Sequence, residues 1–211
     1  MTFLFTRGQK LLFIGDSITD AGRSPILLLG DGYVRRFQDL TRARYPDLNL
    51  SILNRGISGE TTRDLLGRWE RDVIHLQPDW LFIKVGINDV WSMIDGFFLE
   101  GISLEEFEIN YRSLIEQTEK HTRAKVVLIE PLLVEKNRQD NFRKALAHYQ
   151  EKVAQLADEY HLLSVKLQQA FDKGLLSQPA GYWAEDRVHP TPVGHALIAE
   201  QILAVCGYEW S

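Results

Sequence analysis

The 211-residue chain contains one cysteine, Cys206, and therefore cannot form a disulfide bond within itself. A small fold held together by disulfides is excluded, and the single thiol fits a reducing compartment. No apolar run approaches the ~20 residues that cross a bilayer, and residues 1–10 lack the apolar core and cleavage site of a secretory signal. These absences predict a cytoplasmic protein with no membrane partner.

The chain also lacks an excess of positive charge. It has 24 lysines and arginines and 29 acidic residues, which gives a net charge of −5. This balance gives no general attraction to phosphate backbones, so we expect no nucleic-acid partner. The composition, with 45% hydrophobic and 25% charged residues, is typical of a globular protein. No linker, repeat or low-complexity tract divides the chain, which predicts a single domain spanning residues 1–211.

Short apolar runs alternate with longer segments of helical periodicity. The predicted strands are residues 11–14, 50–53, 80–85, 125–129 and 162–165. The predicted helices are residues 33–45, 61–76, 104–122, 138–160 and 192–205. Ser103 and Thr191 have the side chains of helix N-caps, and Pro192 suits a first helical position. Because the strands are almost continuously apolar, the pattern predicts an α/β fold with a parallel sheet covered on both faces.

In open parallel sheets, ligands bind beyond the carboxyl ends of the strands. Three predicted strands are followed by unusual polar segments, and a fourth such segment lies near the C-terminus. The four segments are Gly-Asp-Ser-Ile-Thr-Asp (15–20), Asn-Arg-Gly-Ile-Ser-Gly-Glu-Thr (54–61), Gly-Ile-Asn-Asp (86–89) and Asp-Arg-Val-His-Pro (186–190). A single α/β fold would bring all four to the same rim.

Ser17, His189 and Asp186 have the residue types of a nucleophilic hydrolase. A serine needs a base within hydrogen-bond reach, and that base needs a partner that sets its tautomer. Asp186 and His189 are three residues apart, so the carboxylate can accept from Nδ1 while Nε2 faces Ser17. Because the base must be neutral, we expect activity to fall below a pH of about 6.5, where an ordinary histidine is protonated.

The same chemistry requires donors for the oxyanion of a tetrahedral intermediate. The candidates are the backbone N–H groups of Ser17 and Gly59 and the side-chain amide of Asn88. Glycine lets the chain approach an oxyanion closely, and asparagine is an uncharged donor.

Other residues close to these segments have more than one interpretation. Asp16 can hold its turn by accepting backbone N–H groups, and it is also a candidate substrate contact. Trp91, Tyr182 and Trp183 are further candidate substrate contacts because flat rings stack on sugar faces, although core packing accounts for each of them equally well. Asp89 is interpreted as a structural residue.

The four segments resemble, in order, the four sequence blocks of the SGNH, or GDSL, hydrolases, with Ser17, Gly59, Asn88 and His189 matching the four named residues. The resemblance implies a three-layer α/β/α sandwich with a mostly five-stranded parallel sheet, a flavodoxin-like arrangement. It also implies ester hydrolysis without a metal or another cofactor.

Within that family, the chain is similar to the bacterial acetylxylan esterases from its first strand through Glu209 and Trp210. This similarity implies a small acylated substrate, an acetylated xylo-oligosaccharide, and an acyl-enzyme intermediate. It also implies a homo-oligomer, and Trp210 is compatible with a contact between subunits. The chain departs from that branch at Glu185, where a tryptophan is usual, and in a shorter segment at residues 22–30.

Two rival enzymes and one non-enzyme remain open from the sequence. A broad-specificity GDSL esterase, thioesterase or lysophospholipase would use the same residues with a longer acyl channel. A metal-dependent phosphoesterase would instead need several carboxylates and histidines around a divalent ion. Its ligands would be Asp16, Asp20, Asp89, Asp186 and His189. A sugar-binding or scaffold protein without activity is the third alternative.

Overall fold

The computed structural model describes residues 2–94 and 101–210 and has a five-stranded parallel sheet with the order β2-β1-β3-β4-β5. The strands are β1 (Lys10–Gly15), β2 (Ser51–Gly56), β3 (Trp80–Lys84), β4 (Lys125–Ile129) and β5 (Leu163–Val165). Each lies within two residues of a strand predicted from the sequence, apart from the end of β2. The predicted α/β class and the parallel sheet are therefore confirmed.

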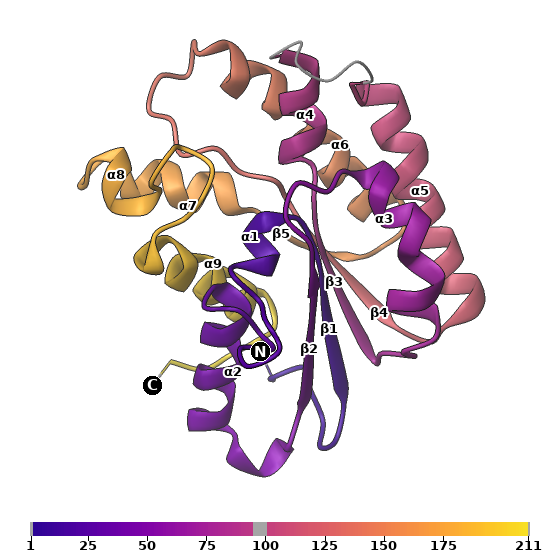
Figure 1. The fold of residues 1–211 in the computed structure, drawn as a ribbon. Helices are drawn as coiled ribbons and strands as arrows, with labels where there is room; N and C mark the ends of the chain where they lie inside the picture. Colours follow the sequence, from indigo (N-terminus) through magenta and orange to yellow (C-terminus); the bar gives the residue numbers. More distant parts are fainter. Residues whose placement is uncertain (1, 95–100, 211) are drawn as a thin grey trace.

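Helices cover both faces of this sheet (Figure 1), which confirms the three-layer sandwich. One face carries α2 (Tyr33–Arg44), α7 (Leu167–Gly174) and α9 (Pro192–Val205). The other face carries α3 (Thr62–Trp69), α5 (Leu104–His121) and α6 (Asn141–Glu159). Shorter elements near the carboxyl ends of the strands are α1 (Ser17–Asp20), α4 (Ile87–Ile94) and α8 (Ala180–Trp183).

Two predicted helix starts are confirmed by their capping bonds. The Ser103 side chain accepts the Glu106 backbone N–H at the start of α5, and the Thr191 side chain accepts the Gly194 N–H at the start of α9. The helix predicted over residues 61–76 forms as α3 followed directly by a wider π-helical segment, Glu70–Ile74, so its second half is helical but not α-helical.

The sheet and its helices share a continuous cluster of buried apolar side chains. β1 lies between β2 and β3, and its last residue, Gly15, is in register with Gly56 and Lys84. A Cβ atom on Gly15 would overlap the Lys84 carbonyl group, so glycine permits the close approach of these strands. No helix within the described ranges is both long and apolar enough to cross a membrane.

Candidate active site

Ser17 is the first residue of α1, the single helical turn that follows β1. The preceding residue, Asp16, caps this turn because its Oδ1 accepts the Ile18 backbone N–H at 3.0 Å. Asp16 has no exposed surface. The structure therefore corrects its assignment as a substrate contact, since its carboxylate points into the interior and positions the serine-bearing turn instead.

Asn54 connects this turn to the neighbouring strand. It lies in β2, where its buried Nδ2 donates to the carbonyl oxygens of Thr19 at 2.6 Å and Leu29 at 2.8 Å, while its Oδ1 accepts the Gly56 N–H. One amide thus satisfies backbone groups of three segments. It ties α1 to β2 and to the loop that ends near Leu29.

His189 and Asp186 complete a hydrogen-bonded series with Ser17. The Ser17 Oγ lies 3.0 Å from His189 Nε2, and His189 Nδ1 lies 2.6 Å from Asp186 Oδ2. The serine and the histidine are 172 positions apart in the sequence, yet the fold places them in contact. The arrangement has the geometry of a nucleophile, a base and an orienting carboxylate.

The Asp186 carboxylate is stabilised in its ionised form. Burial raises its pKa, but the backbone N–H of His189, the His189 ring and the Val188 N–H all donate to it, and together they lower the pKa below its usual value. Asp186 therefore stays negative at neutral pH and favours a proton on His189 Nδ1, which leaves Nε2 to accept from Ser17.

Arg187, between these two residues, adopts a left-handed backbone conformation with a φ of 75°. Its guanidinium lies 3.0 Å from a Glu135 carboxylate oxygen and 2.8 Å from one of Asp140. Its carbonyl accepts the Val134 N–H at 2.8 Å. Because this conformation is unfavourable for a residue with a Cβ atom, these contacts hold the turn that carries His189.

The three predicted oxyanion donors lie around one cavity of about 640 Å³, which is lined by Ser17, Gly59, Asn88 and His189 among others. Gly59 has a φ of 84°, and nothing lies within 4 Å of where its Cβ would be. Asn88 Nδ2 donates one hydrogen to the Glu60 carbonyl oxygen at 2.9 Å. The second hydrogen of that amide stays available for a ligand.

The remaining walls of this cavity are apolar and acidic. Its apolar lining residues are Ile18, Ala21, Pro190 and Pro192. Asp31 and Glu185 contribute carboxylates, and no lysine or arginine lines the cavity in the described part of the chain. The cavity thus suits an uncharged ligand better than an anionic one.

His195, in α9, also lines the cavity. Its Nδ1 accepts the Tyr33 backbone N–H at 3.2 Å, which places its proton on Nε2. Burial, followed by the charges of Lys84 and Arg36, lowers the pKa of His195 to about 4. This second histidine is therefore neutral at neutral pH.

Asp89 and Asp20 hold the loops around the cavity. Asp89 is buried and accepts the backbone N–H and the hydroxyl of Thr62, which agrees with the structural role predicted for it. Burial raises the pKa of Asp89 to about 7. Asp20 accepts the Ser58 hydroxyl at 2.8 Å and so links α1 to the loop that contains Gly59.

The candidate aromatic contacts lie outside the lining of this cavity. Trp183 packs against Phe171 and is partly buried, and Tyr182 lies beside it with 43% of its surface exposed. Trp91 lines a separate cavity of about 190 Å³ together with Asp186 and four other residues. The structure thus does not bring these three rings to Ser17, while Glu185 does reach the cavity.

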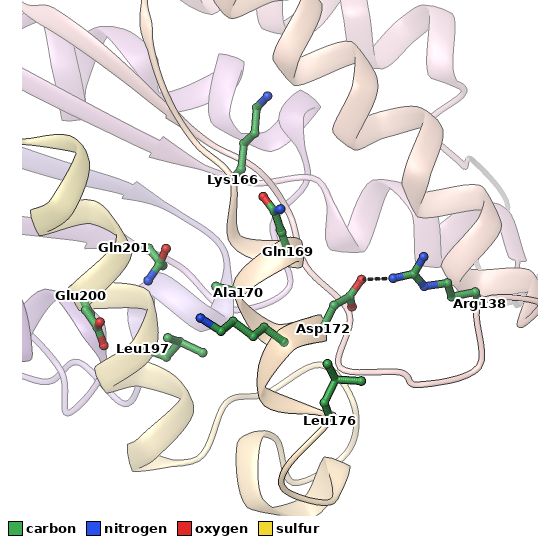
Figure 2. Close-up of a pocket in the computed structure, with 10 residues that line it drawn as sticks. Arg138, Lys166, Gln169, Ala170, Asp172, Leu176, Leu197, Glu200 and Gln201 are labelled. Atoms are coloured by element: carbon green, nitrogen blue, oxygen red, sulfur yellow. Dashed lines mark ion pairs between the residues drawn. The ribbon is translucent and has the colours of Figure 1, made fainter.

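A second large cavity, of about 670 Å³, shares no lining residue with the one beside Ser17. Figure 2 shows its side chains, among them Arg138 and Asp172, which form an ion pair at 3.6 Å. Charged groups of both signs surround it, and none of the residues predicted for the site lies there.

The described ranges contain no group of three or more histidine, cysteine, aspartate or glutamate residues that could hold a metal ion. The five ligands of the metal-dependent alternative do not form such a group. Asp16 faces Lys84 and Asp89 faces Thr62, whereas Asp186 is committed to His189.

Comparisons with known proteins agree with this geometry. The chain is 42% identical to an acetylxylan esterase of Geobacillus stearothermophilus, over 96% of each chain. The crystal structure of Axe2, an acetylxylan esterase from the same organism, matches this chain with a TM-score of 0.93. The match covers 98% of each of the two chains, which are 41% identical. An α/β hydrolase from the metagenome of Lake Arreo is 36% identical over 98% of each chain, with a TM-score of 0.92. The model of the GDSL-like lipase/acylhydrolase family matches residues 13–197, and the chain belongs to that family.

Proposed function

We propose that the protein is a serine esterase that removes acetyl groups from acetylated xylo-oligosaccharides. The observation that carries the proposal is the series Ser17, His189 and Asp186, which opens onto a cavity with three candidate oxyanion donors. The similarity to acetylxylan esterases over nearly the whole chain supports the substrate class. Solved structures of Axe2 include catalytic mutants with alanine at a serine, an aspartate or a histidine, the same three residue types.

In the proposed reaction, His189 Nε2 takes the hydroxyl proton of Ser17 as Oγ attacks the acetyl carbonyl carbon. The backbone N–H groups of Ser17 and Gly59 and the amide of Asn88 receive the oxyanion. The C–O bond to the sugar then breaks, and His189 returns the proton to the sugar oxygen. Water repeats the sequence on the acetyl-enzyme, which releases acetate and restores the serine.

The cavity lining favours this substrate over those of the related hydrolases. A lysophospholipid or a coenzyme A thioester carries phosphate groups, but the described cavity lining holds the carboxylates of Asp31 and Glu185 and no lysine or arginine. Arg36, outside the lining, pairs with Asp31 at 3.1 Å and leaves Glu185 as the uncompensated carboxylate. Repulsion would weaken the binding of such anions. A xylose unit is uncharged, and its hydroxyl groups can donate to both carboxylates.

Two assays test the proposal. The first compares p-nitrophenyl acetate with p-nitrophenyl octanoate, and we expect faster turnover of the acetyl ester. Faster octanoyl turnover would favour the broad-specificity alternative.

The second assay treats the enzyme with an organophosphate and locates the adduct by mass spectrometry, and we expect modification of Ser17 with loss of activity. An enzyme that resists the organophosphate but loses activity to a chelator would support the metal-dependent alternative.

A further inference from the structure

A lysine is completely buried beneath the turn that carries Ser17. Lys84 ends β3, and its side chain has no exposed surface. Its Nζ lies 4.0 Å from Asp16 Oδ1, and neither Nζ nor Asp16 Oδ2 has a hydrogen-bond partner within residues 2–94 and 101–210. Lysine is almost never fully buried without a compensating charge. Asp16 supplies that charge.

A contribution to folding stability does not explain why Lys84 and Asp16 are both buried. Both groups lose their hydration, and an attraction at 4.0 Å without a hydrogen bond offsets this loss weakly. Buried ion pairs of this kind can often be replaced by apolar side chains without loss of stability. A role in the neighbouring site is the stronger explanation.

The pair lies where charge matters most for an ester hydrolase. Asp16 precedes Ser17, whose backbone N–H is a proposed oxyanion donor, and its carboxylate caps the same turn. In a buried site the effective dielectric constant is low, so a negative charge acts strongly over a few ångströms. An uncompensated Asp16 carboxylate would therefore oppose the negative charge that develops on the substrate oxygen.

We propose that Lys84 is a positioning residue for the reaction: its ammonium group neutralises Asp16, so that the carboxylate can cap the Ser17 turn without opposing the oxyanion. This inference rests on the proposed esterase function. Lys84 belongs to none of the motif segments, and the signal for it in the sequence is a single charge within the apolar run of residues 80–85.

Other titratable groups that interact with the pair do not replace Lys84. They are His189, His195, Asp89, Tyr33 and Tyr111. None carries a permanent positive charge, and His195 is neutral at neutral pH because its pKa is lowered to about 4. Burial raises the pKa of Asp16 and lowers that of Lys84, and the opposite charge of the partner acts against each of these shifts.

The test uses Lys84→Met, Asp16→Asn and the double variant, with Lys125→Met as the control. Lys125 is an exposed lysine at the start of β4. Active sites are counted by organophosphate titration, and kcat and KM for p-nitrophenyl acetate are measured from pH 6 to 9. We expect Lys84→Met to lower kcat at least about tenfold with KM changed less than about threefold. The double variant should recover to within about fivefold of the wild type, and Lys125→Met should match the wild type.

A folded Lys84→Met enzyme with a kcat within about twofold of the wild type across this pH range would overturn the inference. If Lys84→Met does not fold, Asp16→Asn is compared with the double variant. Because Lys84 acts through Asp16, adding Lys84→Met to the Asp16→Asn variant should change kcat less than about threefold. A further loss of about tenfold would show that Lys84 acts in another way and would overturn the inference.

Failure of the proposed esterase function can be distinguished from failure of the inference about Lys84. A wild-type enzyme whose hydrolysis survives Ser17→Ala would contradict the esterase mechanism, whatever the Lys84 variants do. In that case the free energies of unfolding of the wild type, the two single variants and the double variant test the pairing itself. The pairing predicts that Lys84→Met destabilises the wild type more than it destabilises the Asp16→Asn variant, and equal losses would overturn it.

Discussion

Asp186 holds His189 at two points, because its Oδ1 accepts the histidine backbone N–H at 2.7 Å and its Oδ2 lies 2.6 Å from the ring Nδ1. One carboxylate therefore sets both the position of the main chain and the orientation of the ring. The proposed base and its orienting group form a local unit within a single turn. The contact with Ser17, 172 positions away in the sequence, depends on the tertiary fold.

The variant Asp186→Asn separates these two functions. Its amide oxygen can still accept the His189 backbone N–H, but its NH₂ group would face Nδ1 and force the ring proton onto Nε2. We expect kcat to fall roughly a thousandfold or more, with little change in the melting temperature. Steady-state kinetics on p-nitrophenyl acetate check this, and a kcat within about tenfold of the wild type would contradict the role of Asp186.

Asn88→Ala removes the proposed side-chain donor from the oxyanion site. We expect kcat to fall about a hundredfold to a thousandfold, while KM changes little, because the donor acts mainly on the transition state. The variant also loses the bond to the Glu60 carbonyl, so its circular dichroism spectrum is recorded as a control. A folded variant with a raised KM and an unchanged kcat would assign Asn88 to substrate binding instead.

Arg187 offers a test of the turn geometry. Arg187→Ala removes the ion pairs with Glu135 and Asp140 but keeps a Cβ atom at a φ of 75°, whereas Arg187→Gly removes the same ion pairs and accepts that φ readily. We expect both variants to be less stable than the wild type. The glycine variant should retain about 1 kcal/mol more unfolding free energy than the alanine variant. Urea denaturation measures the difference, and a less stable glycine variant would contradict the proposed strain.

The buried carboxyl group of Glu130 should make the folding stability depend on pH. Burial raises its pKa to about 7, and its carboxylate accepts the Gln168 backbone N–H at the start of α7. A raised folded-state pKa means that the protonated form is favoured by folding. Its contribution is therefore fully present below the unfolded pKa of about 4.5 and is lost as the pH rises through 7. The free energy of unfolding should fall between pH 5 and 8, with Glu130 contributing on the order of 3 kcal/mol.

Glu130→Gln keeps an acceptor oxygen for Gln168 but cannot titrate, so it should reduce this fall. Part of the slope should remain, since burial raises the pKa of Asp89 to about 7 as well. Glu70→Gln, at an exposed side chain, is the matched control. A wild-type stability that rises from pH 5 to 8, or a slope unchanged in Glu130→Gln, would contradict this account.

The long elements and the motif residues were predictable from the sequence. The apolar runs marked the strands because a sheet covered on both faces buries most side chains of its central strands, as at Leu11 and Phe82, which have no exposed surface. Helices such as α5 and α6 were predictable because they are long enough to show a repeat of 3.6 residues. Their ends depend on local capping bonds, and these can also be recognised in a sequence.

The short elements and the site walls were not predictable in the same way. α1 and α8 each have four residues, too few for a helical repeat to be seen. Proximity in sequence suggested that Trp91 and Trp183 touch substrate, but the packing of distant segments turns them elsewhere. Conversely, Lys84 and His195 belong to the site only because tertiary contacts bring Asp16 and Tyr33 to them.

Acetate release from acetylated xylo-oligosaccharides, measured for the wild type and Ser17→Ala side by side, decides whether Ser17 is the nucleophile of an acetyl esterase. Replacing Ser17 with alanine removes the nucleophile without disturbing the cap that Asp16 provides. We expect rapid release by the wild type and a rate at least about a thousandfold lower for Ser17→Ala. Equal release by both proteins, or none by a folded wild type that hydrolyses longer acyl esters, would contradict this expectation.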